Sequence, residues 1–284
     1  MTVRRRLLAF PVLLALALGG VACGGDDGDD AGSDEPDDAG SGETETTEPE
    51  APAEPLRILV TNDDGVGGEG IAAVVEGLRS LDDVEVTVVA PAENQSGTGG
   101  NTSPTPPAAS EAELVDGTPA IAVAGFPADA VVHGLENVLD EPPHLVVSGI
   151  NQGQNLGPIV EISGTVGAAR RAAEAGVPAL AVSQGLGAEL DYPVAVELVL
   201  DWVEEHRDAL LAGEVPTDEI VNLNVPSCDT GELRGVAEVP TATDVNDRNP
   251  VTEPSDCEAT TEDPVDDIDA FLTGYAALST VTVP

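Results

Sequence analysis

The chain has 284 residues, of which 53 are Asp or Glu and only ten are basic, all of them arginine, so the formal net charge is −43. This surplus of acids excludes DNA, RNA and anionic membrane surfaces as partners, because affinity for phosphate groups requires clustered Lys and Arg. Apolar residues make up 41% of the chain, enough for the core of one ordinary domain, whereas three cysteines are too few for a disulfide scaffold or a Cys-based zinc site.

The first 23 residues have the pattern of an export signal. Three arginines at 4–6 precede an apolar run from Leu7 to Ala22, which Cys23 follows. The run, about 16 residues, is short for a transmembrane helix. Its end resembles a bacterial lipobox, in which the cysteine is lipidated and becomes the mature N-terminus. We therefore predict a lipoprotein signal peptide over 1–23 and an extracytoplasmic, lipid-anchored protein. An ordinary secreted protein and an uncleaved anchor are the alternatives.

An acidic segment separates this signal from the folded part. Residues 24–55 contain 13 Asp or Glu and no Lys or Arg, with Gly, Pro, Ala, Ser and Thr filling the rest. Such a composition cannot form a core, and its like charges repel one another, so it predicts a disordered, extended tether. The folded domain is then expected to cover 56–284.

From residue 56 onward, strand and helix patterns alternate. Short apolar runs indicate strands, and apolar residues three or four apart indicate helices. In chain order the sequence predicts a strand at 56–61, a helix at 70–81, a strand at 84–90, a helix at 128–139, a strand at 145–148, a helix at 164–175, a strand at 179–183, a helix at 193–211 and a strand at 220–225. This alternation predicts an α/β fold with a single doubly wound, mostly parallel sheet and helices on both faces. The pattern fades between residues 227 and 269, which indicates a loop or a small C-terminal lobe.

Polar clusters follow the carboxyl ends of three of these strands. They are Asn62-Asp63-Asp64, Asn94-Gln95-Ser96 and Ser148-Gly149-Ile150-Asn151. Ligands of open α/β sheets bind at this edge, so side chains far apart in the sequence can converge there. Carboxylate, hydroxyl and amide oxygens together suit a hard divalent ion such as Mg²⁺, Mn²⁺ or Ca²⁺. The alternative is that Asn-Asp-Asp-Gly only forms a turn.

Several collinear motifs resemble the SurE family of metal-dependent nucleotidases. The resemblance spans roughly residues 56–226, and a weaker match follows at Gly274-Tyr275. Its motifs are Ile58–Gly65, Gly70-Ile71, Ala90–Gly97, Val147–Gly157, Ser163–Ala169, Val177–Ser183 and Asn222–Pro226. The departures are Phe126, where similar sequences usually have Thr, and Ile162, where they usually have an aromatic residue. The segment after Pro226 also lacks the basic and aromatic residues typical of the family's C-terminal lobe.

The resemblance implies a SurE-like, Rossmann-like fold and one divalent ion, Mg²⁺ or Mn²⁺. It implies hydrolysis of nucleoside monophosphates by a 5'/3'-nucleotidase, an acid-phosphatase-like phosphoric monoester hydrolase, with the nucleotide as partner and a homodimer as a further implication. The ion would be held by Asp63, Asp64, Ser96 and Asn151, and the two aspartates would be the catalytic residues. A metal suits this reaction because a phosphate dianion repels an incoming nucleophile.

Five further residues are candidates for binding substrate. Ser163, Gly164 and Thr165 open a predicted helix, whose first N–H groups favour an anion such as phosphate. Ser163 acting as an ordinary N-cap is the alternative, and both roles are compatible. Asn62 is a candidate for orienting the carboxylates or the leaving group, and Asn155 for contacting the site directly or through another residue.

Two other functions are consistent with parts of the sequence. A non-catalytic protein that binds nucleotide or metal would keep the same motifs. A lipid anchor with an acidic tether is also the layout of a solute-binding lipoprotein, although 229 residues after the tether are short for two lobes around a solute.

Cys228 and Cys257 are the two thiols that would be left after lipidation of Cys23. Both fall in the weakly patterned C-terminal segment, and an oxidising compartment favours pairing, so we predict a disulfide between them. Two unpaired thiols are the alternative.

Overall fold

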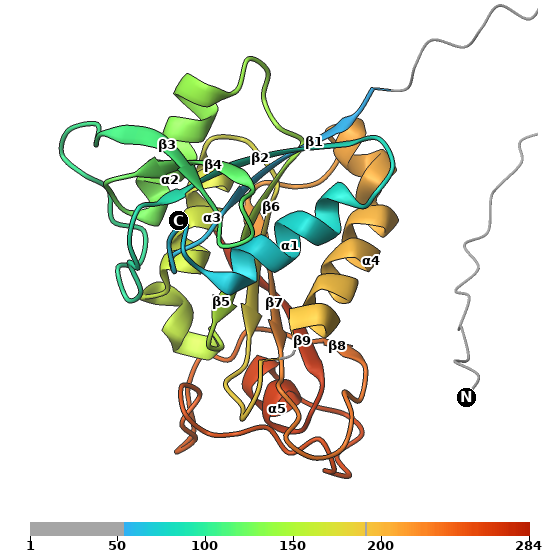
Figure 1. Cartoon of the computed structure of the whole chain (residues 1–284). Helices are drawn as coiled ribbons and strands as arrows, with labels where there is room; N and C mark the ends of the chain where they lie inside the picture. Colours follow the sequence, from blue (N-terminus) through green and yellow to red (C-terminus); the bar gives the residue numbers. More distant parts are fainter. Residues whose placement is uncertain (1–53, 191) are drawn as a thin grey trace, which may run out of the picture. The chain divides into compact units, whose positions relative to one another are not determined.

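A sheet of nine strands forms the centre of this computed structural model, which describes residues 54–190 and 192–284 (Figure 1). The strand order is β3-β4-β2-β1-β5-β6-β7-β9-β8. The strands from β4 to β7 run parallel, whereas β3 and β9 run antiparallel to β4 and β7. The strands are β1 (Leu56–Thr61), β2 (Val84–Pro91), β3 (Ala109–Glu113), β4 (Pro119–Val123), β5 (Leu145–Gln152), β6 (Ala179–Gln184), β7 (Glu219–Val225), β8 (Val236–Glu238) and β9 (Ala276–Thr282).

Helices cover both faces of the sheet. One face packs against α1 and α4, where Ile71, Val75 and Leu78 of α1 are fully buried at helical spacing. The other face packs against α2 and α3, and small alanines on α3 let that helix lie close to the strands. The helices are α1 (Glu69–Arg79), α2 (Pro127–His133), α3 (Gly164–Glu174), α4 (Tyr192–Leu211) and α5 (Asp267–Leu272), with short turns of helix at Gly134–Val138 and Gly157–Glu161.

The strand order reverses at β1. The chain moves from β1 to β2 on one side of the sheet and later returns to place β5 on the other side of β1. In open α/β sheets, the carboxyl ends of the strands on either side of such a reversal are where ligands bind. The motifs that the sequence analysis singled out leave the sheet at this edge.

The predicted α/β sheet with helices on both faces is confirmed, and the five predicted strands and four predicted helices are present. Two boundaries were wrong: β5 continues to Gln152 across an irregularity after Ser148, and regular α-helix ends at His133. The β3–β4 hairpin, β8, α5 and β9 were not predicted. The sequence of β3 is Ala-Ser-Glu-Ala-Glu, which has little strand propensity, and antiparallel pairing with β4 rather than burial places it in the sheet.

The C-terminal segment folds into a small lobe that ends in β9, drawn in orange and red in Figure 1. Leu156, Ile268, Phe271 and Leu272 belong to its core, and all are at most 3% exposed. Cys228 and Cys257 form a disulfide in this lobe, with their Cα atoms 5.8 Å apart. The expectation of a loop or lobe over 227–269 therefore resolves to a lobe with its own apolar core.

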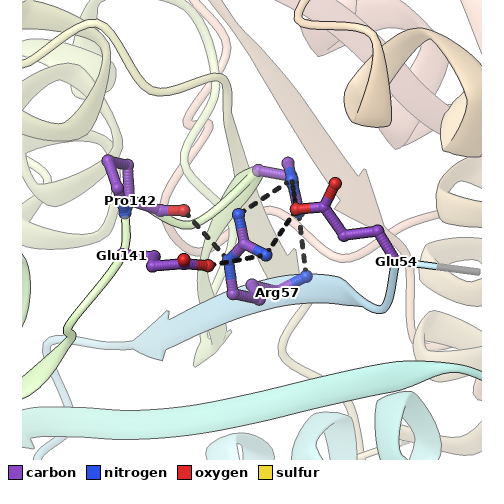
Figure 2. A network of polar contacts seen from close by, with 5 residues as sticks. Glu54, Arg57, Glu141 and Pro142 are labelled. Atoms are coloured by element: carbon purple, nitrogen blue, oxygen red, sulfur yellow. Dashed lines mark hydrogen bonds and ion pairs between the residues drawn. The ribbon is translucent and has the colours of Figure 1, made fainter.

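A polar network closes the opposite, amino-terminal edge of the sheet at β1 and β5 (Figure 2). The Arg57 guanidinium donates to Glu54 Oε1 at 2.8 Å and to the Pro142 carbonyl at 3.2 Å, and it forms an ion pair with Glu141 at 3.3 Å. The Arg57 backbone N–H donates to His144 Nδ1 at 3.0 Å. This network fixes the start of the folded part against the strand next to β1.

The predicted signal peptide, Cys23 and nearly all of the acidic tether lie outside the described residues. Across residues 54–190 and 192–284, no helix combines the length and the apolar character needed to cross a membrane.

Candidate functional site

Loops that follow β1, β2 and β5 meet at the carboxyl edge of the sheet. The Gln95 backbone N–H donates to the Asp63 carbonyl at 2.7 Å, which brings the loop after β2 against the end of β1. The Gln152 backbone N–H donates to Asp64 Oδ2 at 3.0 Å, which does the same for the end of β5. Three motifs separated by up to 90 residues therefore converge on the two aspartates.

Asp63 is the buried member of the pair, with 3% of its surface exposed. Its Oδ1 accepts a 2.7 Å hydrogen bond from the Thr165 hydroxyl. Burial raises the pKa of Asp63 to about 6, the charge of Asp64 adds to the rise, and the Thr165 hydrogen bond opposes it. The carboxylate is thus costly to ionise in this position unless a positive charge accompanies it.

Gly164 makes the close approach between α3 and Asp63 possible. A Cβ on residue 164 would lie 2.7 Å from the Asp63 Cβ and 2.8 Å from its Oδ2. Any side chain there would collide with the carboxylate, so glycine is required at the first position of α3. The start of α3 therefore packs directly against the Asp63 carboxylate.

Asp64 is less buried and is held by two donors. Asn94 Nδ2 donates to its Oδ1 at 2.9 Å, opposite the Gln152 N–H on Oδ2. Burial raises the pKa of Asp64, and these two hydrogen bonds counteract the rise. One oxygen is oriented by the loop after β2 and the other by the last residue of β5, so the carboxylate has a defined direction.

Asn62 is fully buried and holds the loop that carries the aspartates. Its Oδ1 accepts from the Gly65 N–H at 3.1 Å, and its Nδ2 donates to the Gly65 carbonyl at 2.9 Å. Both polar ends of the side chain are thus engaged by one residue of the loop. This geometry agrees with the interpretation that Asn62 orients the carboxylates, and it leaves contact with a leaving group as an untested prediction.

Ser96 and Asn151, the other two expected metal ligands, lie next to residues that contact the aspartates. Ser96 is exposed, and its backbone N–H donates to the Asn94 side chain at 2.9 Å. Asn151 is 7% exposed, and its Nδ2 donates to the Gly153 carbonyl, which points its amide oxygen away from that bond. Ser96 and Asn151 are thus each next in the chain to a residue whose backbone N–H bonds to Asp63 or Asp64.

A buried amide network lies behind Thr165. Asn155 Nδ2 donates to Ser183 Oγ at 2.9 Å and reaches Thr165 Oγ1 at 3.5 Å. Asn224 holds the backbone of Asn155 at both ends, accepting from its N–H at 2.7 Å and donating to its carbonyl at 3.1 Å. Asn222 adds a second donor to that carbonyl at 3.0 Å. Asn155 thus contacts Thr165, whose hydroxyl in turn donates to Asp63.

The start of α3 faces Asp63. Ser163 is the N-cap, and its Oγ accepts from the Val166 N–H at 3.2 Å. The N–H groups of Gly164 and Thr165 have no partner within the helix, as at any helix start, and the helix dipole favours an anion there. The N-cap role of Ser163 is present, and it is compatible with phosphate binding by the next two residues.

The donor chemistry of this cluster fits a divalent cation. Among the described residues, no Arg or His forms an ion pair with Asp63 or Asp64. Within residues 54–190 and 192–284, no three His, Cys, Asp or Glu side chains gather into a group that could hold a metal ion, so a bound ion would also need neutral oxygen ligands. Two adjacent carboxylates supply the hard oxygen ligands that a divalent cation such as Mg²⁺, Mn²⁺ or Ca²⁺ accepts.

Sequence reasoning missed several residues that build the site. Asn94 and Gln152 orient Asp64, although only their neighbours were singled out as ligands. Tyr192, at the start of α4, is half-buried near Asp64, and burial together with the charges of Asp64 and Glu69 raises its pKa to about 12. Two polar residues at the end of an otherwise apolar strand, Asn222 and Asn224, were the available signal for the amide network.

The fold and the site define a class of protein: a doubly wound α/β protein whose oxygen-rich site lies where the strand order reverses. Comparison with known proteins assigns the family. Residues 58–249 match the family described as Survival protein SurE, and the chain belongs to that family.

Named relatives agree with this assignment. The 5'-nucleotidase SurE of Methanopyrus kandleri is 42% identical over 193 residues, which cover 64% of this chain and 71% of that protein. The 5'-nucleotidase SurE of Halobacterium salinarum is 43% identical over 193 residues, covering 64% and 70%. The crystal structure of the SurE protein from Aquifex aeolicus superposes with a TM-score of 0.65 at 28% identity, covering 80% of this chain and 94% of that one.

Proposed function

We propose that this chain is a metal-dependent nucleotidase that hydrolyses nucleoside monophosphates to nucleoside and phosphate. The observation that carries the proposal is the pair of carboxylates, Asp63 and Asp64, which stand without a described countercharge beside the start of α3. Relatives at about 40% identity are named 5'-nucleotidase SurE, which supports the same reaction.

Asp63, Asp64, Ser96 and Asn151 would hold one divalent ion. The oxygen set favours Mg²⁺ or Mn²⁺ over zinc. When bound, such an ion supplies charge neutralisation of the phosphate and activation of a water. Because the carboxylates are ionised in that state, the ion also offsets the cost of burying the Asp63 charge.

The remaining residues position the ligands and the phosphate. Thr165 holds Asp63 Oδ1, and Asp63 Oδ2 lies against Gly164. The start of α3, where partial positive charge accumulates, would bind the phosphate, while the backbone N–H of Thr165 also stabilises the Asp63 carboxylate. Asn155, held by Asn224, keeps Thr165 in place, and Asn62 keeps the aspartate loop closed on Gly65.

Phosphate release tests the proposal directly. Purified protein with Mn²⁺ or Mg²⁺ should release phosphate from 5'- and 3'-nucleoside monophosphates, and EDTA should abolish the release. Restoring the ion should restore it. No phosphate release from any nucleotide with any divalent ion would contradict the proposal and favour a protein that only binds nucleotide or metal.

We also propose that the enzyme works outside the cytoplasm on a lipid anchor at Cys23, with a signal peptide at 1–23, an acidic tether at 24–55 and the nucleotidase domain at 56–284. The disulfide between Cys228 and Cys257 supports an oxidising compartment. In cells, the wild type should partition into detergent, whereas Cys23→Ala should shift to precursor or soluble material. Wild-type protein found wholly in the soluble fraction would favour an ordinary secreted enzyme.

The homodimer implied by the family resemblance stays a prediction. Sedimentation of the purified domain at several concentrations measures the oligomeric state.

A further inference from the structure

Asp267, the first residue of α5, carries a carboxylate that is buried in the C-terminal lobe. None of its surface is exposed, and across residues 54–190 and 192–284 no Arg or His forms an ion pair with it. Burial raises the pKa of Asp267, and hydrogen bonds from backbone N–H groups counteract the rise. A neutral or apolar side chain would avoid the cost of burying this group, so packing alone does not account for an aspartate here.

The two carboxylate oxygens of Asp267 join two segments of the chain. Its Oδ2 accepts from the Gly157 N–H at 2.9 Å, and its Oδ1 accepts from the Ala242 N–H at 2.8 Å. Gly157 belongs to the segment that follows β5, whereas Ala242 belongs to the core of the C-terminal lobe. A carboxylate accepts on both oxygens, whereas the side-chain amide of Asn has only one oxygen. Asp267 therefore connects the lobe to the segment after β5 in a way that Asn could not.

The lobe holds this segment at neighbouring residues as well. Gly157 has a φ of +50°, and a Cβ on it would lie 2.8 Å from Ile268 Cδ1, so the backbone packs directly against the lobe. Leu156 is fully buried in the apolar core of the lobe. Gln154 Nε2 donates to the Val251 carbonyl at 3.1 Å. The position of the segment after β5 is therefore set by the C-terminal lobe.

The same segment reaches Thr165 by two routes. Asn155, two residues before Gly157, contacts Thr165 Oγ1 through its Nδ2 at 3.5 Å. In the other direction the chain runs from Gly157 through the helical turn at Gly157–Glu161 to Ser163, the N-cap of α3. Thr165 lies in the first turn of α3, and its hydroxyl donates to Asp63 Oδ1 at 2.7 Å. The residue that Asp267 holds is thus close in the chain to both structures that place the Thr165 hydroxyl.

We propose that Asp267 is a positioning residue of the proposed site: it holds Gly157 so that Asn155 and the start of α3 keep the Thr165 hydroxyl on Asp63. This inference rests on the proposed nucleotidase function and adds to it a role for the C-terminal lobe. The Asp267 carboxylate is engaged by two backbone N–H groups, so it acts on the reaction only through the segment that it holds. Its loss should change the geometry around Asp63, and small displacements of a catalytic group are costly.

Asp267→Asn tests the proposal, because it keeps the size of the side chain and places an NH₂ group against one of the two backbone N–H groups. With 5'-AMP and saturating Mn²⁺, kcat should fall about tenfold, as expected when the support of a metal ligand is loosened. Asp266→Asn is the matched control. It removes the same charge from the neighbouring residue, the N-cap of α5, where Asn accepts from the Asp269 N–H as well as Asp does. Its kcat should stay near that of the wild type, and Tm should show that both variants are folded.

A double-mutant cycle with Thr165→Val distinguishes positioning from a general loosening of the fold. Because Asp267 acts through Thr165, the double variant should lose less kcat/KM than the product of the two single losses. Independent losses that multiply would overturn the role, as would an unchanged kcat in Asp267→Asn or an equal loss in Asp266→Asn. Should Asp267→Asn fail to fold, Gly157→Ala tests the same contact from the other side, since its Cβ comes nearest to the flexible end of Ile268. It should couple to Thr165→Val in the same way, and an absence of coupling would overturn the role.

Binding of Mn²⁺ alone, measured by titration calorimetry, tests the same role without catalysis. The Kd for Mn²⁺ should rise about tenfold in Asp267→Asn, because Asp63 is less well placed, and should not change in Asp266→Asn. A wild type that binds Mn²⁺ but releases no phosphate from any nucleotide would overturn the proposed function, and weaker Mn²⁺ binding by Asp267→Asn would still support the positioning role. Equal Mn²⁺ affinity in the wild type and Asp267→Asn would overturn the positioning role alone.

Discussion

Asp63 is positioned by neutral neighbours rather than by a countercharge. The Thr165 hydroxyl holds one of its oxygens, and Gly164 allows the start of α3 to approach the other. Burial raises the pKa of Asp63 to about 6, so the site favours an ionised carboxylate most strongly when a cation is present. The arrangement of single residues therefore points to a metal ion more strongly than the residue types alone.

Gly164→Ala tests this packing. The added methyl group would lie 2.7 Å from the Asp63 Cβ and must displace either the carboxylate or the helix start. We expect a loss of activity of roughly a hundredfold or more, because small misplacements in an active site are costly. Gly67→Ala is the control, since a Cβ there has no atom within 4 Å, and its activity should stay near that of the wild type. Full activity in Gly164→Ala would show that this approach is not required.

The ligand residues could be predicted from the sequence, but their supporting contacts could not. Asp63, Asp64, Ser96 and Asn151 each follow a recognisable strand, and strand ends converge in this type of sheet. The hydrogen bond between Thr165 and Asp63 joins residues 102 positions apart, and no local sequence pattern predicts it. The hydrogen bond between Asn224 and Asn155 is equally non-local, because it depends on how β7 lies beside β6 and the loop after β5.

At the scale of elements, prediction succeeded where burial dominates. Buried strands such as β1 and β6 have nearly continuous apolar sequences, and α1 has a clear apolar stripe. Prediction failed where strand pairing or tertiary contact determines the structure. The strand β3 is polar and exposed at the edge of the sheet. The six-residue helix α5 depends on the packing of Phe271 and Leu272 in the C-terminal lobe. Elements this short contain too few residues to give a recognisable hydrophobic periodicity in the sequence.

The disulfide should stabilise the C-terminal lobe. It closes a segment of 29 residues between Cys228 and Cys257. Removing it with Cys228→Ser and Cys257→Ser together should lower the free energy of unfolding by roughly 3 kcal/mol, because the open chain regains entropy when unfolded. Denaturant titration of the double variant and the oxidised wild type measures the difference. Coincident midpoints would show that the disulfide contributes nothing to the fold.

The network in Figure 2 predicts a pH dependence of stability. Burial, with the Arg57 charge next, lowers the pKa of His144, and Nδ1 accepts a hydrogen bond from the Arg57 backbone N–H. The folded state therefore prefers neutral His144, so its stabilising contribution is present above the unfolded pKa of about 6.5 and is lost as the pH falls below it. Between pH 8 and 5.5 the Tm of the wild type should fall more than that of His144→Asn. Parallel Tm profiles would contradict this role.

At the scale of the whole molecule, charge dominates. The part of the chain after residue 55 has 40 acids and seven arginines, a net −33. Pairing cannot neutralise this surplus, since most acids have no basic partner available. Mutual repulsion between the exposed acids therefore opposes the compact state, and dissolved salt screens it.

Salt should stabilise the protein. The Debye length falls from about 10 Å at 0.1 M to about 3 Å at 1 M, which weakens repulsion between surface carboxylates. The Tm should rise between 0.1 and 1 M NaCl, and activity should persist in molar salt because the anionic substrate is also less repelled. Sucrose, which is uncharged, should not reproduce the full rise. A Tm that is flat or falls over this range would leave the acidity without this explanation.

The turnover of Asp63→Asn and Asp64→Asn is the most direct test of the proposal that these two aspartates form the catalytic metal site of a nucleotidase. Phosphate release from a nucleoside monophosphate with saturating Mn²⁺ should fall by roughly three orders of magnitude or more in each variant, because charge stabilisation supplies much of the catalysis. Circular dichroism and Tm should show that both variants are folded. Near-normal turnover in either variant, with metal still bound, would contradict the account.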